Sequence, residues 1–532
     1  MSRFHSVPLL RADTLYQLLA SRFSGGQKRL KDIPPPELLL NAKKAAQRIA
    51  KAIKNKERIT LIGDYDVDGV TSTSIVVLFF REIGYPLTAI IPNRFNDGYG
   101  LSANVLQRVD ADIVITVDNG ITAVEAAQLC KERGIDLIIT DHHTPSHQLP
   151  DAYTIVNPKL KDCSYPFKEI CGAQVVWLLL GVLKQELSLA VDMRQYLDLV
   201  ALAIIADVMP LYDVNRVIVQ EGLKQMMFSQ RPSSIIIREF LAKESISSED
   251  IAFNIAPRIN SAGRVEDASI ALEFLTAQSI DIAANRFEIL TDLNNIRKLT
   301  EADTTESASL HVNEDDKIIV VAGAGWHEGV VGIVASRLVN QFKKPAIVLS
   351  IHGDVAKGSA RSIGEVDIFT LIQTQNHLLE KFGGHKMAAG LSLHVNNIEQ
   401  FSKALNEEAK KLDPLDFIPK VEILGELEPE ALNLDLLHIL DQFEPYGEGN
   451  PRPRFLIKNA ELLHVKLFGA EKNHSRLQIR LKPYLNQTID VVAFRQVLEV
   501  PQDKRITCSY TVTKNVFNGK TSLQLMLDNI YN

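Results

Sequence analysis

The chain has 532 residues, of which 46% are hydrophobic and 23% charged, and its formal net charge is −7. This length predicts two to four domains, and the composition excludes disordered and fibrous proteins. No apolar run reaches the roughly 18 residues of a membrane span, and the amino terminus lacks the pattern of a secretory signal. The four cysteines form no Cys-x-x-Cys pair. We therefore expect a cytoplasmic protein with reduced thiols and no zinc site.

Charge is unevenly distributed along the chain. Residues 451–532 contain 13 Lys or Arg and 6 Asp or Glu, a net of +7, so the preceding residues carry −14. Residues 413–450 hold ten carboxylates against the single Lys420. The sequence therefore predicts a basic C-terminal module. Part of the negative charge before residue 451 lies in residues 413–450, and part belongs to clustered carboxylates. Cations bound to those carboxylates would reverse the sign of the local electrostatic field.

The first half of the chain predicts an α/β domain. Residues 1–45, which include three consecutive prolines, are expected to form a leader to it. Residues 46–230 alternate apolar strands with helical stretches at 70–80 and 122–133. This alternation is typical of a parallel sheet with helices on both faces. Residues 231–310 are expected to be a helical connector between two lobes.

The second half predicts a second α/β domain followed by a barrel. Residues 311–412 contain apolar strands at 318–321 and 346–350, separated by glycine-rich turns. In residues 413–532 the period changes, because polar and apolar residues alternate at 476–482 and 522–525, and Asn518 with Gly519 predicts a hairpin turn. This pattern indicates a small antiparallel barrel or sandwich.

Four apolar stretches each end in acidic residues. These stretches are 58–63, 113–117, 137–140 and 201–206, and the last could be a strand or a helix. The side chains that come after them are Asp64, Asp66, Asp68, Asp118, Asp141, His142, His143 and Asp207. Ligands bind beyond the carboxyl ends of parallel strands, so we expect these side chains to converge there. A single Asp after a strand is usually a helix cap. For Asp141, the alternative is therefore that it only caps the following segment.

The convergence of these carboxylates predicts a metal-binding site. They repel one another and would protonate unless cations neutralised them. Oxygen ligands with one or two imidazoles suit Mn²⁺ or Mg²⁺ better than zinc. Two ions roughly 3.5 to 4 Å apart can activate a water and hold the phosphate oxygens of an in-line displacement. The sequence therefore favours cleavage of phosphodiesters.

The same residues resemble the ordered motifs of the DHH phosphoesterase superfamily. The matching segments are residues 64–69 with 71–74, residues 118–120, residues 141–143 and Asp207. Later segments resemble the other domains found in its single-stranded-DNA-specific exonucleases. Residues 326–332, 358–362 and 383–390 look like a DHHA1-type domain, and residues 445–451 with Arg454 and Phe455 look like the opening of an OB fold. The resemblance covers residue 45 to the end.

The resemblance implies a four-part α/β architecture after the leader. It consists of a parallel-sheet DHH catalytic domain at 46–230, a helical connector at 231–310, a DHHA1-type nucleic-acid-binding domain at 311–412 and an OB-fold β-barrel at 413–532. The implied activity is 5′-to-3′ exonuclease digestion of single-stranded DNA to mononucleotides with two Mn²⁺ or Mg²⁺ ions, in DNA repair and recombination.

The resemblance also assigns roles to the motif residues. Asp66, Asp68, Asp118, His142 and Asp207 are implied metal ligands, with Asp118 bridging the ions and Asp64 less certain as a direct ligand. His143 is expected to contact the scissile phosphate or to protonate the leaving oxygen, as an imidazole can near neutral pH. The alternative is that His143 only fixes the site. Asp141 is expected to orient the histidines or to cap the next segment.

Arginines are expected to complete the charge balance, because a guanidinium matches phosphate oxygens. Arg258 and Arg264 are candidates for gripping the scissile phosphate, and Arg94 for contacting the DNA backbone. Ser359 and Arg361, in a glycine-flanked turn, are candidates for binding a terminal 5′-phosphate. His385 is expected in the same wall of the groove. The alternative for any one Arg is a solvated surface charge.

A narrow cleft between two lobes is expected to admit only an unpaired strand, which the basic barrel would guide. Barrels of this type stack bases on aromatic side chains. The candidates are Phe455, Phe468, Phe494 and Phe517, of which at least two are expected to pack in the core. Besides single-stranded DNA, a helicase and a single-strand-binding protein are candidate partners. A monomer is expected.

Three other interpretations compete with this one. A phosphodiesterase of the same superfamily acting on pyrophosphate, cyclic dinucleotides or short oligonucleotides would need no basic barrel. A non-catalytic replication scaffold would tend to lose the metal carboxylates, and all of them are present. An oxidoreductase is disfavoured because no Gly-x-Gly-x-x-Gly follows the first strand.

Overall fold

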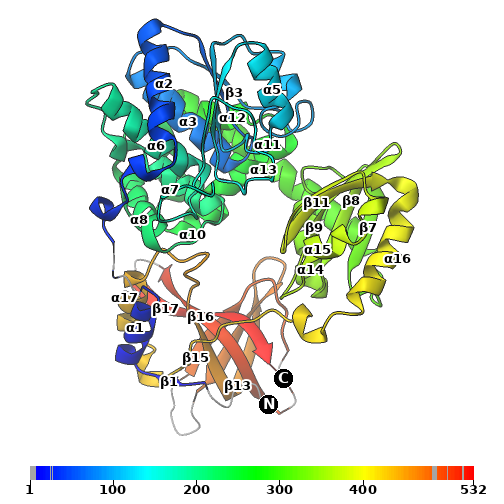
Figure 1. The fold of residues 1–532 in the computed structure, drawn as a ribbon. Coiled ribbons are helices and arrows are strands. Elements are labelled where there is room, and N and C mark those ends of the chain that lie inside the picture. The colour runs from blue at the N-terminus through cyan, green and yellow to red at the C-terminus, as the bar shows by residue number, and fades with distance from the viewer. Residues whose placement is uncertain are drawn as a thin grey trace.

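The computed structural model describes residues 7–23, 26, 28–481, 488–499, 501, 503–517 and 520–531. Three compact parts surround a common centre, as Figure 1 shows: an α/β part with the helical connector, a second α/β part, and a barrel. The expected mixed α/β architecture with a C-terminal barrel is confirmed. Within the described ranges, no helix is long and apolar enough to cross a membrane.

The first α/β part is built on a five-stranded sheet of order β3-β2-β4-β5-β6. All of its pairings are parallel, and the central strands are buried on both faces. The strands are β2 (Ile59–Ile62), β3 (Thr88–Ile90), β4 (Ile113–Val117), β5 (Asp136–Thr140) and β6 (Thr154–Val156). The predicted parallel sheet is therefore confirmed, and β2, β4 and β5 lead into the predicted acidic residues.

Helices cover this sheet and extend below it. They are α2 (Ala42–Asn55), α3 (Val67–Glu82), α4 (Ala103–Leu106), α5 (Val124–Glu132), α6 (Gly172–Glu186), α7 (Leu197–Ala206) and α8 (Asp213–Phe228). The fourth apolar stretch is thus helical, because α7 packs between α3, α6 and α8 in the core. A segment buried on every side has no helical period that sequence could reveal.

The connector is helical, as expected. It comprises α9 (Pro232–Leu241), α10 (Ser248–Asp250), a π-helical turn (Ile251–Ile255), α11 (Ala256–Val265), α12 (Ser269–Leu275) and α13 (Ile280–Ser309). The Arg-rich segment that sequence singled out is α11. The long α13 runs from the first α/β part to the second, as Figure 1 shows, and so spans the two lobes.

The second α/β part has a mixed sheet of order β10-β11-β9-β8-β7, in which only β7 and β8 are parallel. The strands are β7 (Ile319–Ala324), β8 (Ala346–His352), β9 (Val355–Arg361), β10 (Lys381–His385) and β11 (Ala388–His394). The helices are α14 (Val331–Phe342), α15 (Ile368–Gln373) and α16 (Ile398–Ala409). The helices cover the sheet, and α14 begins directly after the glycine-rich turn that follows β7.

The C-terminal part is a closed barrel of order β13-β14-β15-β17-β16. Its strands are β13 (Arg454–Phe468), β14 (His474–Arg480), β15 (Thr488–Ala493), β16 (Arg505–Phe517) and β17 (Lys520–Tyr531). The alternation seen in sequence is that of barrel strands with one face in the core. The expected hairpin turn at residues 518–519 lies outside the described residues.

The amino-terminal segment differs from the expected leader to the first domain. Strand β1 (Leu9–Leu10) pairs with β12 (Glu426–Leu427), and α1 (Ala12–Ser21) packs against α17 (Leu434–Gln442). Leu15 and Leu19 lie four positions apart on one face of α1, and both are buried in the barrel's core. This segment is therefore part of the barrel's hydrophobic core.

Candidate metal centre and nucleic-acid cleft

Carboxylates from separate elements converge on the imidazole of His142. Its Nε2 lies 3.2 Å from Asp118 Oδ1, 3.5 Å from Asp207 Oδ2 and 3.7 Å from Asp68 Oδ2. Asp118 and His142 follow neighbouring parallel strands, β4 and β5, so their side chains share one edge of the sheet. Asp68 comes from the first turn of α3, and Asp207 follows the last residue of α7.

The backbone holds these ligand candidates in fixed places. Asp66 caps α3 by accepting a hydrogen bond from Gly69 N at 3.0 Å. Asp68 accepts bonds from Gly172 N at 2.6 Å and Ala173 N at 2.8 Å, at the start of α6. Asp118 has φ of +62°, a left-handed conformation that is sparsely populated without glycine. Such strain persists only where surrounding structure enforces it.

Burial gives the cluster an unusual electrostatic state. It raises the pKa of Asp64, Asp66 and Asp118, and the neighbouring carboxylates raise it further. Burial, reinforced by Asp68 and Asp66, raises the pKa of Asp207 to about 8. Burial also lowers the pKa of His142, which favours the neutral imidazole that a metal requires.

The buried atoms of the cluster fit a divalent cation. Among the described residues, Asp64 Oδ1, Asp118 Oδ1, Asp207 Oδ2 and His142 Nδ1 are buried without a hydrogen-bond partner. Buried polar atoms are nearly always paired, so the free lone pairs of the three carboxylate oxygens call for a cation. The overlapping sets whose ligand atoms lie within 4.8 Å are Asp64–Asp66–Asp118, Asp68–His142–Asp207 and Asp118–His142–His143. This oxygen-rich donor set suits Mn²⁺ or Mg²⁺.

Asp141 holds His143 rather than joining the cluster. Its Oδ1 accepts bonds from His143 Nδ1 at 2.7 Å and from the backbone N–H of His142 and His143. Its Oδ2 accepts a bond from Ile121 N at 2.9 Å. Burial would lower the pKa of His143, but the hydrogen bond and charge of Asp141 raise it to about 9. Asp141 thus makes the orienting contacts that sequence suggested.

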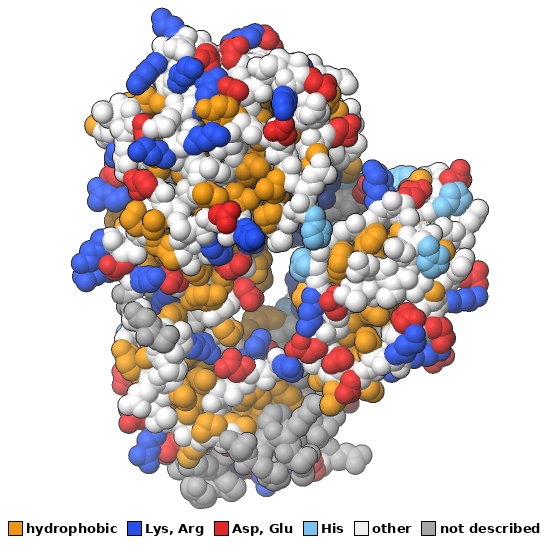
Figure 2. Space-filling view, in the orientation of Figure 1, with side chains coloured by type: hydrophobic (Ala, Val, Ile, Leu, Met, Phe, Trp, Pro, Cys, Tyr) orange, Lys and Arg blue, Asp and Glu red, His pale blue; other side chains and the backbone are white. Residues whose placement is uncertain are grey.

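A hollow of about 1050 Å³ lies between the two α/β parts and brings several predicted residues together. Arg94, His143, Arg264, Ser359 and Arg361 all line it. Figure 2 shows Lys, Arg and His side chains gathered along the seam between these parts. A cleft that combines cations with an adjacent carboxylate cluster can hold an anion against bound metal.

The arginines are fixed mainly by backbone oxygens. Arg94 donates from Nε to Gly263 O at 3.1 Å and stacks 4.2 Å from the centre of the Tyr65 ring. Arg264 donates from Nη1 to Gly329 O at 3.2 Å. Burial lowers the pKa of Arg264 to about 10, and the charge of Arg94 adds to this effect.

Ser359 and Arg361 form a pair on β9. The Nη1 of Arg361 donates to Ser359 Oγ at 2.8 Å. A Cβ at Gly332, near the start of α14, would lie 3.1 Å from both the Arg361 Nη2 and Ser359 Oγ atoms. Because Gly332 has no side chain, the Ser359 and Arg361 side chains have room beside it in the lining of the cleft.

Two predicted residues are not brought to this cleft. Arg258 stacks 4.2 Å from the centre of the Phe240 ring and donates to Asn254 O and Thr291 Oγ1 within the connector. It lies six positions before Arg264 on α11, about 240° around the helix, so the two cannot share a face. His385 is exposed at the β10–β11 turn, and the cleft is lined by Gly383 and Gly384 instead. The structure therefore places Arg258 away from the cleft, against the expectation that it grips the scissile phosphate.

Sequence reasoning missed three residues that shape the site. Tyr99 donates from its hydroxyl to Asp118 O at 3.3 Å, and Asn157 donates to His143 O at 2.9 Å. A Cβ at Gly172 would lie 2.6 Å from Asp118 Oδ1. Asn157 directly follows β6 at the same edge of the sheet, so the rule that identified Asp118 and His142 could also have identified Asn157. Nothing in the sequence marks Tyr99 or Gly172.

The barrel's aromatic candidates separate into core and surface. Phe455 is fully buried. Phe468 and Phe494 form an edge-to-face cluster with His474, with ring centres 5.2 to 5.8 Å apart, and Phe494 is half exposed. Phe517 has a side chain outside the described set. Phe468 and Phe494 therefore remain the candidates for base stacking.

Comparison with known proteins finds the same parts in the same order. The model of the DHH family N-terminal domain matches residues 58–204, the DHHA1 domain model matches residues 315–411, and the RecJ OB domain model matches residues 423–529. The crystal structure of RecJ in complex with Mn²⁺ from Thermus thermophilus is similar with a TM-score of 0.83 and 30% identity, covering 97% of this chain and 76% of that one.

Curated relatives carry the same likeness along most of the chain. The single-stranded-DNA-specific exonuclease RecJ of Bacillus subtilis is 36% identical over 93% of this chain, which spans 64% of that relative's length. Its namesakes from Haemophilus influenzae and Escherichia coli are 33% and 32% identical over 94% and 95% of this chain, and 92% of each is covered. The chain therefore belongs to the RecJ family of single-stranded-DNA-specific exonucleases.

Proposed function

We propose that this chain is a metal-dependent exonuclease that degrades single-stranded DNA from the 5′ end to mononucleotides. The single observation that carries the proposal is the convergence of Asp68, Asp118, Asp207 and His142 beside a cleft lined by arginines. Relatives named for this activity support it, and one RecJ structure is of the complex with Mn²⁺. Roles in DNA repair and recombination, and a cytoplasmic location, belong to the same proposal.

The site is proposed to hold two divalent ions. Asp64, Asp66 and Asp118 form one ligand set, and Asp68, His142 and Asp207 form another. Asp118 Oδ1 lies 3.2 Å from His142 Nε2, so its carboxylate stands where the two sets meet and is the candidate bridge. Ions bound there would activate a water and stabilise the phosphate oxygens of an in-line displacement.

The chain's own residues position the strand. Arg264, buried between Asp66 and the second α/β part, is placed to hold the scissile phosphate with its planar fork. Arg94, stacked on the Tyr65 ring in the lining of the cleft, would hold the strand's backbone. Ser359 and Arg361 would bind the terminal 5′-phosphate, which sets the polarity because it places the first phosphodiester at the carboxylates.

His143 is proposed to act on the leaving oxygen. Its Nδ1 is occupied by Asp141 at 2.7 Å, so only Nε2 is free to face the cleft that its ring lines. Burial opposes the charged imidazole, but the hydrogen bond and charge of Asp141 raise the pKa of His143 to about 9, which favours the protonated ring. A protonated Nε2 can donate a proton to the departing 3′-oxygen or a hydrogen bond to the phosphate.

A test of chain length and strandedness separates this proposal from its alternatives. With Mn²⁺ present, a long single strand, the same sequence as a blunt duplex, a dinucleotide and pyrophosphate are compared as substrates. The proposal expects the long single strand to be degraded fastest and the duplex to survive. Preference for pyrophosphate or the dinucleotide would instead identify a small-substrate phosphodiesterase, and absence of cleavage would favour a scaffold. A matched reaction with EDTA reports the metal dependence.

A further inference from the structure

A second hollow, of about 590 Å³, lies between the first α/β part, the connector and the barrel. This volume is within the roughly 300–1,000 Å³ of ordinary ligand sites. Figure 2 shows the molecule opened between its three parts, with hydrophobic side chains inside the opening. The hollow's apolar lining comes mainly from the end of α7 and the segment after it, from the π-helical turn and from the start of α11, and includes Ala206, Val208, Met209, Ala252, Phe253 and Pro257.

This hollow adjoins the metal centre. Ala206 and Val208, which line it, flank the ligand candidate Asp207 in the chain. Arg264 lines both this hollow and the cleft between the α/β parts. A strand that passes Arg264 with its 5′ end in the cleft would therefore have its 3′ continuation in the second hollow. Arg452, which precedes the barrel's first strand, also lines the hollow and pairs with Glu249 and Glu444.

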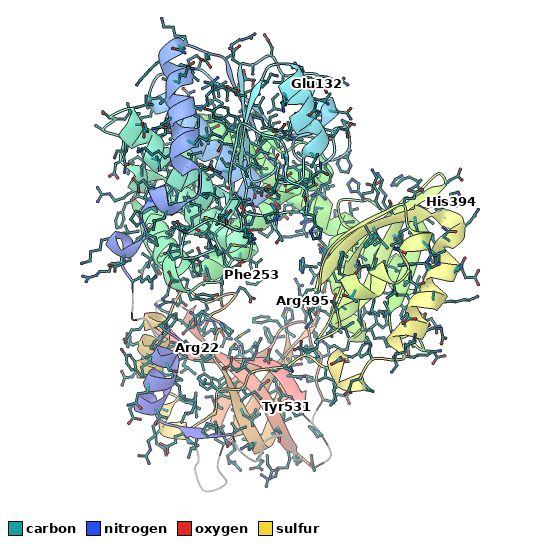
Figure 3. All side chains as sticks on the ribbon, viewed as in Figure 1. Arg22, Glu132, Phe253, His394, Arg495 and Tyr531 are labelled. Carbon is teal, nitrogen blue, oxygen red and sulfur yellow. The ribbon has the colours of Figure 1, made fainter. Side chains whose placement is uncertain are left out.

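Two exposed apolar side chains line the hollow. Phe253, in the π-helical turn, is 76% exposed, and Val208 is 63% exposed. Val208 also has φ of +55°, which is a true outlier for a β-branched residue. Strain of this kind is found at binding sites, where the surroundings hold a residue in place for its ligand. Figure 3 shows Phe253 at the inner edge of the connector, at the opening between the three parts.

We propose that this hollow binds the nucleobases immediately 3′ of the scissile phosphate, with Phe253 as the stacking platform and Val208 packing against the base edge. The inference rests on the proposed function and adds a subsite to it. An exposed aromatic in a groove that leads past a cation, here Phe253 and Arg264, is the chemistry by which proteins bind single strands without sequence preference. A protein or lipid occupant would not explain why the hollow leads to the metal ligands.

The test uses single strands that carry either a normal nucleotide or an abasic one directly 3′ of the first scissile phosphate. Wild type, Phe253→Ala, Phe253→Leu and Phe228→Ala are compared. Phe228 is also 76% exposed but ends α8 and does not line the hollow, which makes it the matched control. Because Phe253 is exposed, its loss leaves the melting temperature unchanged, and thermal unfolding of each variant checks this.

Wild type and Phe228→Ala are expected to lose about 5- to 150-fold in kcat/KM on the abasic strand, the range for one base stacked on an aromatic. Phe253→Ala and Phe253→Leu should show this loss already on the normal strand and little further loss on the abasic one. Equal discrimination by Phe253→Ala and wild type would overturn the subsite. If wild type degrades both strands equally, the subsite again fails and the exonuclease stands. If wild type degrades neither strand, the proposed function itself fails.

Discussion

Gly172 lies directly against Asp118, the carboxylate at the centre of the proposed metal site. A Cβ at Gly172 would lie 2.6 Å from Asp118 Oδ1, closer than side-chain carbons approach in folded proteins. The same residue donates its N–H to Asp68 Oδ2 at 2.6 Å. One glycine at the start of α6 therefore fixes two carboxylates that come from different strands and helices.

We predict that Gly172→Ala lowers the rate of metal-dependent cleavage strongly without removing any ligand. The new methyl group must displace Asp118 or shift α6, and a ligand displaced by about 1 Å can cost on the order of 10²-fold in rate. The measurement is kcat with Mn²⁺ together with the Mn²⁺ dissociation constant. Gly181→Ala is the matched control, because in the same helix its Cβ would meet only Pro36 Cγ at 3.8 Å. Wild-type activity in Gly172→Ala would show that Asp118 is not held there.

We predict that Mn²⁺ raises the melting temperature and that chelation lowers it. Bound cations neutralise buried carboxylates that otherwise repel one another, and a ligand at about 100 times its Kd stabilises by about 2.7 kcal/mol. Asp118→Asn should show a much smaller Mn²⁺-dependent shift. Asp151→Asn serves as control, because Asp151 is exposed and pairs with Lys131 far from the cluster. An equal shift in Asp118→Asn and wild type would rule out Asp118 as a ligand.

The two arginines of α11 give a direct test of the corrected assignment. Arg264→Lys keeps a charge in the cleft but loses the planar fork, so kcat/KM should fall by roughly 10- to 150-fold, as for a lost hydrogen bond to a charged group. Arg258→Lys should stay close to wild type, because Arg258 contacts Phe240 and Thr291 within the connector. The measurement is kcat/KM of both variants on a single strand. The reverse order of effects would restore Arg258 to the site.

His143→Ala is predicted to lower kcat by about 10²- to 10⁴-fold, the usual contribution of a positioned proton donor. The Mn²⁺-dependent rise in melting temperature should persist, since Asp68, Asp207 and His142 keep one ligand set complete. Asp141→Asn should produce a milder version of the same loss, because Asp141 acts only through the ring, which it orients and whose pKa it raises. His147→Ala, an exposed histidine of the same loop, should leave kcat unchanged. If His143→Ala also loses the Mn²⁺ shift, His143 is a ligand instead.

The positions of Asp118, Asp141 and His142 could be predicted from sequence because parallel strands bring the residues at their carboxyl ends to one edge of the sheet. That rule needs no side-chain detail. Asp207 was predicted as a site residue, but the element before it could not be assigned as a strand or a helix. The preceding helix is buried on all sides, so its sequence shows no alternation of polar and apolar residues. Arg258 was misplaced because a run of residues does not reveal which side of a helix faces the cleft.

Other features depend on contacts between distant segments. Gly172 meets Asp118 only after α6 packs beneath the sheet, and Tyr99 reaches Asp118 O from a loop. The pairing of Leu9 and Leu10 with residues 426–427 joins the start of the chain to the segment that precedes the barrel. No local pattern encodes such pairings, so sequence alone assigned the amino-terminal segment to the wrong neighbour.

The most direct test of the central claim is a time course with Mn²⁺ on a long single strand labelled at the 5′ or the 3′ end in parallel reactions. The native chain is compared with Asp118→Ala. We expect early release of 5′-labelled mononucleotide, slow loss of the 3′ label and no activity in the variant. Early release of the 3′ label, internal fragments, or full activity in Asp118→Ala would contradict a metal-dependent exonuclease that begins at the 5′ end.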